Sequence, residues 1–195
     1  VAASQPTLFL MQLIDDSGVW GVIETGNSHT CGIQSGNLYC WGRDNYGEIG
    51  NGSSSSDDVE SPSLIDSSGN WEDVTLGFSF TCGIAGGDLY CWGRDDYGQV
   101  GNGSSSSSDV LSPSLIDGSG TWQEVEAGDR HVCGVNDGDL YCWGYDYNGQ
   151  IGNGSASSAD VTEPELIDST LNWQELSLNS SHSCGIVESG NLYCW

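Results

Sequence analysis

One short motif, repeated at a fixed interval, constrains the fold of this chain more than any other feature. It spans residues 30–42, Thr-Cys-Gly-Ile-Gln-Ser-Gly-Asn-Leu-Tyr-Cys-Trp-Gly, and it returns with small changes at residues 81–93, 132–144 and 183–195. Two short apolar runs flank a Gly-Asn or Gly-Asp turn, a pattern typical of a β-hairpin. Each copy is therefore predicted to form a two-stranded hairpin.

Folding each hairpin about its turn places its two cysteines opposite each other. Directly opposed strand residues lie within the roughly 7 Å between Cα atoms that a cystine requires. Zinc is a weaker alternative, because its sites favour roughly two to four residues between paired cysteines, whereas eight intervene in three of these pairs. We expect one disulfide per hairpin, formed by the pairs Cys31–Cys40, Cys82–Cys91, Cys133–Cys142 and Cys184–Cys194.

The hairpin belongs to a longer repeat. Trp20, Trp71, Trp122 and Trp173 are 51 residues apart, and the cysteines keep the same step. This period predicts units at residues 1–19 (partial), 20–70, 71–121, 122–172 and 173–195 (partial). The last hairpin carries one extra residue within 187–189, which predicts a longer turn or a β-bulge there.

Within the unit at 71–121, four strands are expected and no segment shows helical periodicity. The predicted strands are 71–74, 78–84, 88–93 and 111–116, with a Ser-rich loop at 104–109. Pro113 suits an edge strand or a strand start, because it cannot donate a backbone hydrogen bond. The chain is therefore predicted to be all-β.

A four-stranded unit of this size cannot bury its own faces, so it must stack on its neighbours as a propeller blade or a solenoid coil. The tryptophans and the Leu-Tyr-Cys-Trp segments would supply the apolar faces.

The same residues resemble a known repeat. The succession of Trp and Val, His-Thr-Cys-Gly-Ile, Gly-Asn-Leu-Tyr-Cys-Trp-Gly and Tyr-Gly-Glu-Ile-Gly-Asn-Gly is similar to the regulator of chromosome condensation (RCC1) repeat. More narrowly, it resembles the cysteine-bearing form of secreted microbial repeat proteins. The resemblance implies β-propeller blades, commonly seven in a ring. With about four units we expect an incomplete or open array, part of a longer protein or completed by other copies.

Composition excludes several classes of partner. The chain has three Arg, no Lys and 28 Asp plus Glu, a formal net charge of -25. That balance argues against nucleic acid and anionic membranes, and no apolar run is long enough to span a bilayer. Residues 1–13 lack a basic start and a clear cleavage site, so an export signal would lie upstream. The periodic cysteines nevertheless predict an extracellular or cell-surface location.

Two sets of polar residues recur at fixed positions. His29, His131 and His182 share a position that Phe80 fills in another copy, which favours a structural role. Recurrent aspartates follow Trp-Gly or lie near the Ser-rich loops, and they could bind calcium. The absence of an Asp-x-Asp-x-Asp-Gly loop favours turn capping and a solvated acidic surface instead. These aspartates are Asp44, Asp95, Asp146, Asp57, Asp58, Asp109 and Asp160.

Four asparagines satisfy the N-glycosylation pattern, although Gly-Asn-Gly is also an ordinary turn. They are Asn51, Asn102, Asn153 and Asn179. The serines at 53–56, 104–108, 155, 157 and 158 are weaker candidates for O-glycans.

No nucleophile–base–acid set, Gly-x-Ser-x-Gly elbow or phosphate-binding loop is present, so no enzyme activity or resident cofactor is predicted. The leading hypothesis is a secreted structural or adhesive repeat protein that associates head to tail through its ends into an extracellular filament. The alternative is an extracellular protein- or glycan-binding propeller module, in which identical loops would suit a repetitive ligand.

Overall fold

The computed structural model describes residues 13–156 and 159–195, so most of the N-terminal segment considered as an export signal, and Ser157 and Ser158, lie outside it. The described residues form strands, turns and irregular segments with no helix, and hence no helix that could cross a membrane. The strands make four antiparallel sheets, here called blades. Neighbouring strands in each blade follow the order of the chain.

The blades repeat one strand pattern. Blade 1 contains β1 (Trp20–Thr25), β2 (His29–Gln34), β3 (Asn37–Asp44) and β4 (Ser55–Asp66); blade 2 contains β5 (Trp71–Leu76), β6 (Phe80–Ala85), β7 (Asp88–Gly93) and β8 (Val110–Asp117); blade 3 contains β9 (Trp122–Ala127), β10 (His131–Asn136), β11 (Asp139–Gly144) and β12 (Val161–Asp168); and blade 4 contains β13 (Trp173–Leu178), β14 (Ser183–Val187) and β15 (Leu192–Cys194).

Strand bounds differ from the sequence prediction at a few ends. The predicted strand 78–84 begins at Phe80, because the Gly77 amide donates to the Phe80 carbonyl across a tight turn at 3.0 Å. In blade 1 the serine segment expected to be a loop is partly strand. There β3 extends to Asp44, which pairs with Ser55 at the start of β4.

The predicted hairpin is present in every blade, with its turn one residue earlier than the Gly-Asn step. In blade 1 the loop is Ser35–Gly36, and Asn37 already pairs with Gln34. Ser35 and Gly36 have φ of 53° and 77°, the left-handed values that a two-residue hairpin loop needs. The extra residue of blade 4 gives a longer turn and no bulge, closed by the Val187 amide donating to the Asn191 carbonyl at 3.1 Å.

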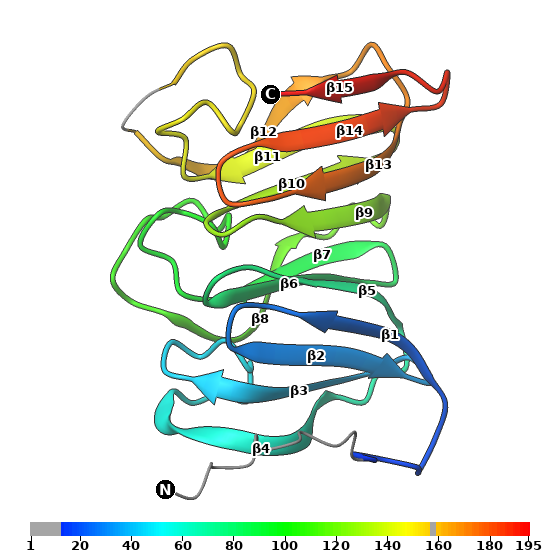
Figure 1. The fold of residues 1–195 in the computed structure, drawn as a ribbon, viewed down its shortest axis with the longest axis vertical. Helices are drawn as coiled ribbons and strands as arrows, with labels where there is room; N and C mark the ends of the chain where they lie inside the picture. The colour runs from blue at the N-terminus through cyan, green and yellow to red at the C-terminus, as the bar shows by residue number, and fades with distance from the viewer. Residues whose placement is uncertain (1–12, 157–158) are drawn as a thin grey trace, which may run out of the picture.

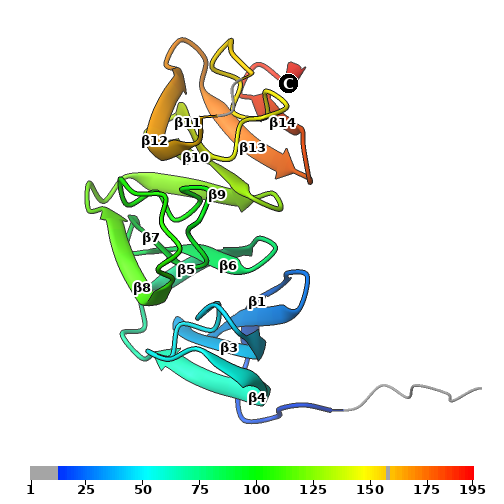
Figure 2. The ribbon, with the colours of Figure 1, turned by 90° about the vertical axis from the view of Figure 1, so that its left-hand side faces the viewer.

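The core lies between blades. Figure 1 shows the four blades following one another along the long axis, and Figure 2 shows the same stack from the side. Three hydrophobic clusters each combine side chains of two neighbouring blades. The sheets stack as predicted, and they form an open array that does not close into a ring.

The first tryptophans of blades 2, 3 and 4, Trp71, Trp122 and Trp173, are central to these clusters. Trp71 is 5 % exposed and packs edge to face on Trp92, with ring centroids 5.9 Å apart. Its ring also lies against Gly83, where a Cβ would come within 2.9 Å of Trp71 Cζ3. Glycine there allows the indole to lie flat on the adjacent strand.

The long loops and the hairpin turns lie at opposite ends of the strands. The long loops after β3, β7 and β11 lie on one side, at the left in Figure 1. The hairpin turns after β2, β6, β10 and β14 lie at the other end of the strands. In blades 1 to 3 the fourth strand is an edge strand, and Pro113 occupies such an edge on β8.

Candidate functional site

The cysteines lie where the hairpin register puts them. Cys31 pairs with Cys40, Cys82 with Cys91, Cys133 with Cys142 and Cys184 with Cys194, and all four pairs are disulfides. In the first pair the Cα atoms are 4.1 Å apart. The described residues contain no free cysteine. Such bonds indicate an oxidising environment.

The recurrent histidines join consecutive blades. His29 Nε2 lies 2.9 Å from Thr81 Oγ1 in blade 2, and Thr81 donates its own proton to the Glu48 carbonyl at 2.9 Å. The histidine must therefore donate through Nε2, which leaves Nδ1 unprotonated, and Nδ1 is buried without a partner. Burial lowers the pKa of His29 to about 4. The ring is thus neutral at physiological pH and has a structural role.

The same bond recurs between blades 3 and 4, where His131 Nε2 lies 2.9 Å from Ser183 Oγ. Between blades 2 and 3, Phe80 replaces the histidine, and the residue opposite is Val132 in place of Thr or Ser. Both members of the pair therefore change together. His182, the last residue of the series, is exposed.

A second set of bonds between blades comes from two carboxylates on β9, which reach the first strands β5 and β13 of the neighbouring blades. Glu124 accepts a hydrogen bond from the Leu176 amide of blade 4 at 2.7 Å. Glu126 accepts one from the Thr75 hydroxyl of blade 2 at 2.9 Å, and Thr75 Oγ1 accepts the Ala127 amide at 3.0 Å. Acidic side chains therefore hold neighbouring blades together.

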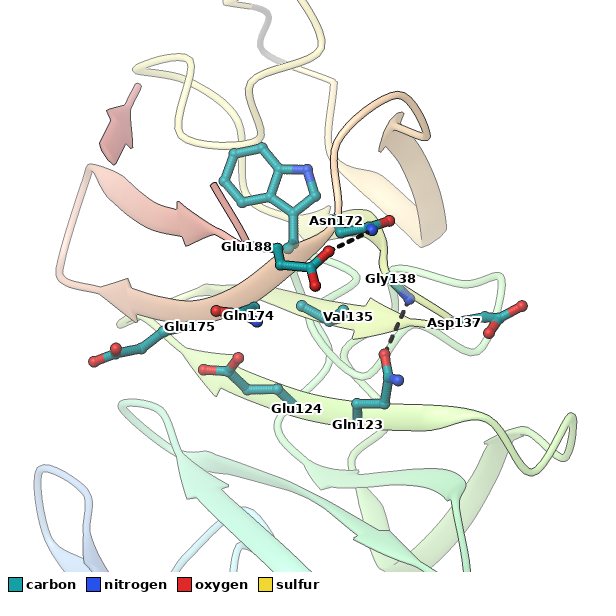
Figure 3. Close-up of a pocket in the computed structure, with 10 residues that line it drawn as sticks. Gln123, Glu124, Val135, Asp137, Gly138, Asn172, Gln174, Glu175 and Glu188 are labelled. Atoms are coloured by element: carbon teal, nitrogen blue, oxygen red, sulfur yellow. Dashed lines mark hydrogen bonds between the residues drawn. The ribbon is translucent and has the colours of Figure 1, made fainter. Parts of the chain in front are cut away.

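A pocket with a volume of about 670 Å³ lies between blades 3 and 4, at the hairpin-turn end. Figure 3 shows side chains from β9, the β10–β11 turn, β13 and the β14–β15 turn around it. Gln123 accepts the Gly138 amide at 3.0 Å, and the Asn172 amide donates to Glu188 at 2.9 Å. We call this the acidic pocket, because four carboxylates line it: Glu124, Asp137, Glu175 and Glu188.

Among the described residues, carboxylates line the acidic pocket without a positively charged side chain to balance them. Burial, against the lowering effect of the Leu176 hydrogen bond and with smaller contributions from Glu126, Asp73 and Glu175, raises the pKa of Glu124 to about 7. The Oε2 atom of Glu124 has no hydrogen-bond partner. No arginine, histidine or cysteine lines the pocket in the part of the chain that the structure describes. Its chemistry suits a cationic group presented by a partner.

The three arginines lie together at the loop end. Arg94 lies over the rings of Tyr46 and Tyr97, 4.9 and 5.9 Å from their centroids, so it bridges blades 1 and 2. It also pairs with Asp96 at 2.6 Å. Arg130 lies 4.7 Å from the Tyr97 centroid and bridges blades 2 and 3.

The alternation of arginine and tyrosine side chains continues into blade 3 because two positions there exchange their residue types. Arg130 stands where the other units have Ser28, Ser79 and Ser181, whereas Tyr145 stands where units 1 and 2 have arginine. Arg130 lies 5.9 Å from the Tyr145 centroid. Both positions flank the same hairpin of blade 3, where the Tyr145 amide donates to the Arg130 carbonyl at 2.9 Å.

Of the seven aspartates considered for calcium, three cap turns, whereas Asp57 and Asp58 lie in β4 and Asp109 and Asp160 directly precede β8 and β12. Asp44, Asp95 and Asp146 are buried, and each accepts the amide of the residue five positions later, at 3.3, 3.2 and 3.2 Å. No group of three or more His, Cys, Asp or Glu with metal-site geometry occurs among the described residues. The four candidate glycosylation asparagines are exposed, and whether they carry glycans stays a prediction.

Comparison with known proteins bears on the fold and the family. The family model for the regulator of chromosome condensation (RCC1) repeat matches residues 35–84, 86–135 and 137–186. The ultraviolet-B receptor UVR8 of Arabidopsis thaliana is 29% identical over 89% of this chain and 40% of its own length. The chain therefore spans less than half of that relative.

Solved structures show the same architecture. Human WBSCR16 superposes with a TM-score of 0.81 at 21% identity, covering 95% of this chain and 49% of that one. Prp20p of Saccharomyces cerevisiae, described together with its binding to Gsp1p and histones, superposes with a TM-score of 0.76 at 21% identity, covering 85% of this chain and 43% of that one.

Proposed function

Because the chain belongs to the RCC1 repeat family, we propose that it is a non-catalytic, extracellular protein-binding module that receives a cationic segment of its partner in the acidic pocket. The observation that carries this proposal is that four carboxylates line one concave site between blades 3 and 4. A lysine or arginine side chain there would pair with Glu124 and its neighbour Glu175, whose negative charge raises the pKa of Glu124.

Two further observations support the proposal. The net charge of -25 would speed encounters with a basic partner, and RCC1 relatives include proteins described by their binding to other proteins. The extracellular location rests on the disulfides, which persist in oxidising compartments.

Binding of a short fluorescent polylysine peptide would test the proposal. The double substitution Glu124→Gln and Glu175→Gln should weaken binding by at least about tenfold, since each lost charged pair contributes roughly 1 kcal/mol or more. The matched control is Glu60→Gln with Glu163→Gln, which removes the same charge from exposed sites on β4 and β12. Equal losses in both variants would reduce the effect to overall charge and contradict the assignment of the pocket.

A second candidate function is structural or adhesive, through head-to-tail association into a filament. Its support is the regularity of the contacts between blades, since the bonds from His29 to Thr81 and from His131 to Ser183 repeat. Copies that share such surfaces could dock on one another. Sedimentation velocity over a range of concentrations would test this candidate, and a monomer throughout would contradict it.

A further inference from the structure

Glu124 uses only one of its two carboxylate oxygens. Its Oε1 atom accepts the Leu176 amide of blade 4 at 2.7 Å, whereas its Oε2 atom is buried and has no hydrogen-bond partner among the described residues. Native structures rarely leave a buried polar atom without a partner. Glu124 lines the acidic pocket, and Figure 3 shows its carboxyl group on the same side as that of Glu175. A donor bound in the pocket would supply the missing partner.

The charged groups that face this carboxyl are all acidic in the part of the chain that the structure describes. Glu126 lies two residues further along the same strand, β9, and Asp73 and Glu175 come from the first strands on either side, β5 and β13. Asp137 and Glu188 line the pocket from the hairpin turns of blades 3 and 4. A proton or a cation would each relieve the repulsion at this site.

The proton and the cation compete for the same group. Burial, with smaller contributions from the neighbouring acids, raises the pKa of Glu124 to about 7, so the charged and protonated forms coexist near neutral pH. A lysine or arginine side chain beside the charged form stabilises that form and displaces the proton. Because coupling between two binding equilibria is reciprocal, a proton on Glu124 weakens binding of the cation to the same degree.

We infer that binding of a cationic partner in the acidic pocket is coupled to release of a proton from Glu124, so that the pocket holds its partner at neutral pH and releases it in mildly acidic surroundings. The inference rests on the proposed function, because it concerns regulation of the same site. Burial also raises the pKa of Asp73 and Glu126, but neither residue lines the pocket. Glu124 is therefore the group that links the buried acids to the bound cation.

Binding of the short fluorescent polylysine peptide at about pH 7.5 and at about pH 5.5 tests the inference. The wild type should lose about tenfold in affinity on acidification, because the fraction of Glu124 that is charged falls. Glu124→Gln should bind more weakly at neutral pH and change little on acidification. Glutamine keeps a side-chain oxygen that can accept the Leu176 amide, but it has no proton to release.

The matched control is Glu175→Gln, which removes one charge from the same pocket and leaves Glu124 free to titrate. This variant should bind more weakly at both pH values and keep most of the pH dependence. Calorimetry in buffers of different ionisation enthalpy counts the protons released on binding. Near neutral pH the wild type should release protons when the peptide binds, and Glu124→Gln should release fewer.

The outcomes separate this inference from the proposed function. A wild type that does not bind the peptide at neutral pH would contradict the proposed function and the inference together. Binding of equal strength at both pH values would overturn the inference alone. A pH dependence or a proton release that Glu124→Gln retains in full would do the same.

Discussion

At the residue scale, Glu48 is the least expected side chain in the molecule. It is 0% exposed, and the equivalent residues in the next two units are Gln99 and Gln150, which are equally buried. Its Oε2 accepts the Tyr46 amide at 2.6 Å, as the side-chain oxygen of Gln99 accepts the Tyr97 amide at 2.8 Å. The other oxygen of Glu48 has no partner. Burial raises the pKa of Glu48, so the charged carboxylate is disfavoured at a site where the other units place a neutral glutamine.

Replacing Glu48 with Gln should stabilise the protein at neutral pH. A group whose pKa is raised on folding stabilises the folded state at low pH, and that contribution is lost as the pH rises through the raised pKa. The variant should match the wild type in acid and gain about 1–3 kcal/mol as the pH becomes neutral. Urea unfolding at a series of pH values measures the difference.

The reciprocal change provides the control. Gln99→Glu places the same carboxyl in blade 2, and it should lower stability at neutral pH while leaving acid stability nearly unchanged. A wild-type pH profile that Glu48→Gln does not alter would contradict the assignment of a buried glutamate whose pKa is raised on folding.

At the scale of strands and blades, each contact surface between blades depends on paired residues 52 positions apart. His29 pairs with Thr81 and His131 with Ser183, whereas Phe80 meets Val132 in the hydrophobic cluster between blades 2 and 3. A polar ring opposite a hydroxyl, or an apolar ring opposite valine, leaves no buried donor unpaired.

Phe80→His alone should therefore destabilise the protein by about 1–3 kcal/mol, because the buried imidazole would face Val132 with no acceptor. Adding Val132→Thr should recover much of that loss. A double-mutant cycle of unfolding free energies measures the coupling between the two positions. If the changes in unfolding free energy of the two single variants simply add, the two positions are not energetically coupled, which would contradict this interpretation of the paired change.

The hairpins were predictable from sequence because their determinants are local. Cys31 and Cys40 are 9 residues apart on one hairpin, and turn composition sets their register. The partner of His29 was not predictable, because a repeat alignment compares His29 with Phe80 and hides the contact with Thr81 one position further on. A repeat alignment also does not show that Arg130 lies beside Tyr97, 33 residues earlier, or that the walls of the acidic pocket come from separate units.

At the scale of the whole molecule, the first strands β5, β9 and β13 carry acidic side chains with no arginine among them. Burial raises the pKa of Asp73 and Glu126 as well as that of Glu124. These groups bind protons more tightly in the folded array than in the unfolded chain. Global stability should therefore rise as the pH falls from neutral toward mildly acidic values.

Glu124→Gln should remove part of this dependence. The wild type should gain about 1–2 kcal/mol from Glu124 between pH 7 and pH 4.5, after allowance for solvent screening. The variant should lack that gain. Thermal unfolding at several pH values measures it, with Glu60→Gln on the exposed strand β4 as the control. If the stability of Glu124→Gln depends on pH as steeply as that of the wild type, the proton taken up on folding belongs to another group.

The paired change at Phe80 and Val132 also has a genetic consequence. Tandem copies commonly exchange by unequal crossing-over, which exchanges whole units at equivalent positions. Here such an exchange could place histidine opposite valine, or phenylalanine opposite threonine, because the matching residue lies in the next copy. The blades therefore have a fixed order. An exchange preserves the contact only when the two facing residues stay together. What must be kept is therefore the pair of residues that meet between two blades, and not a single blade.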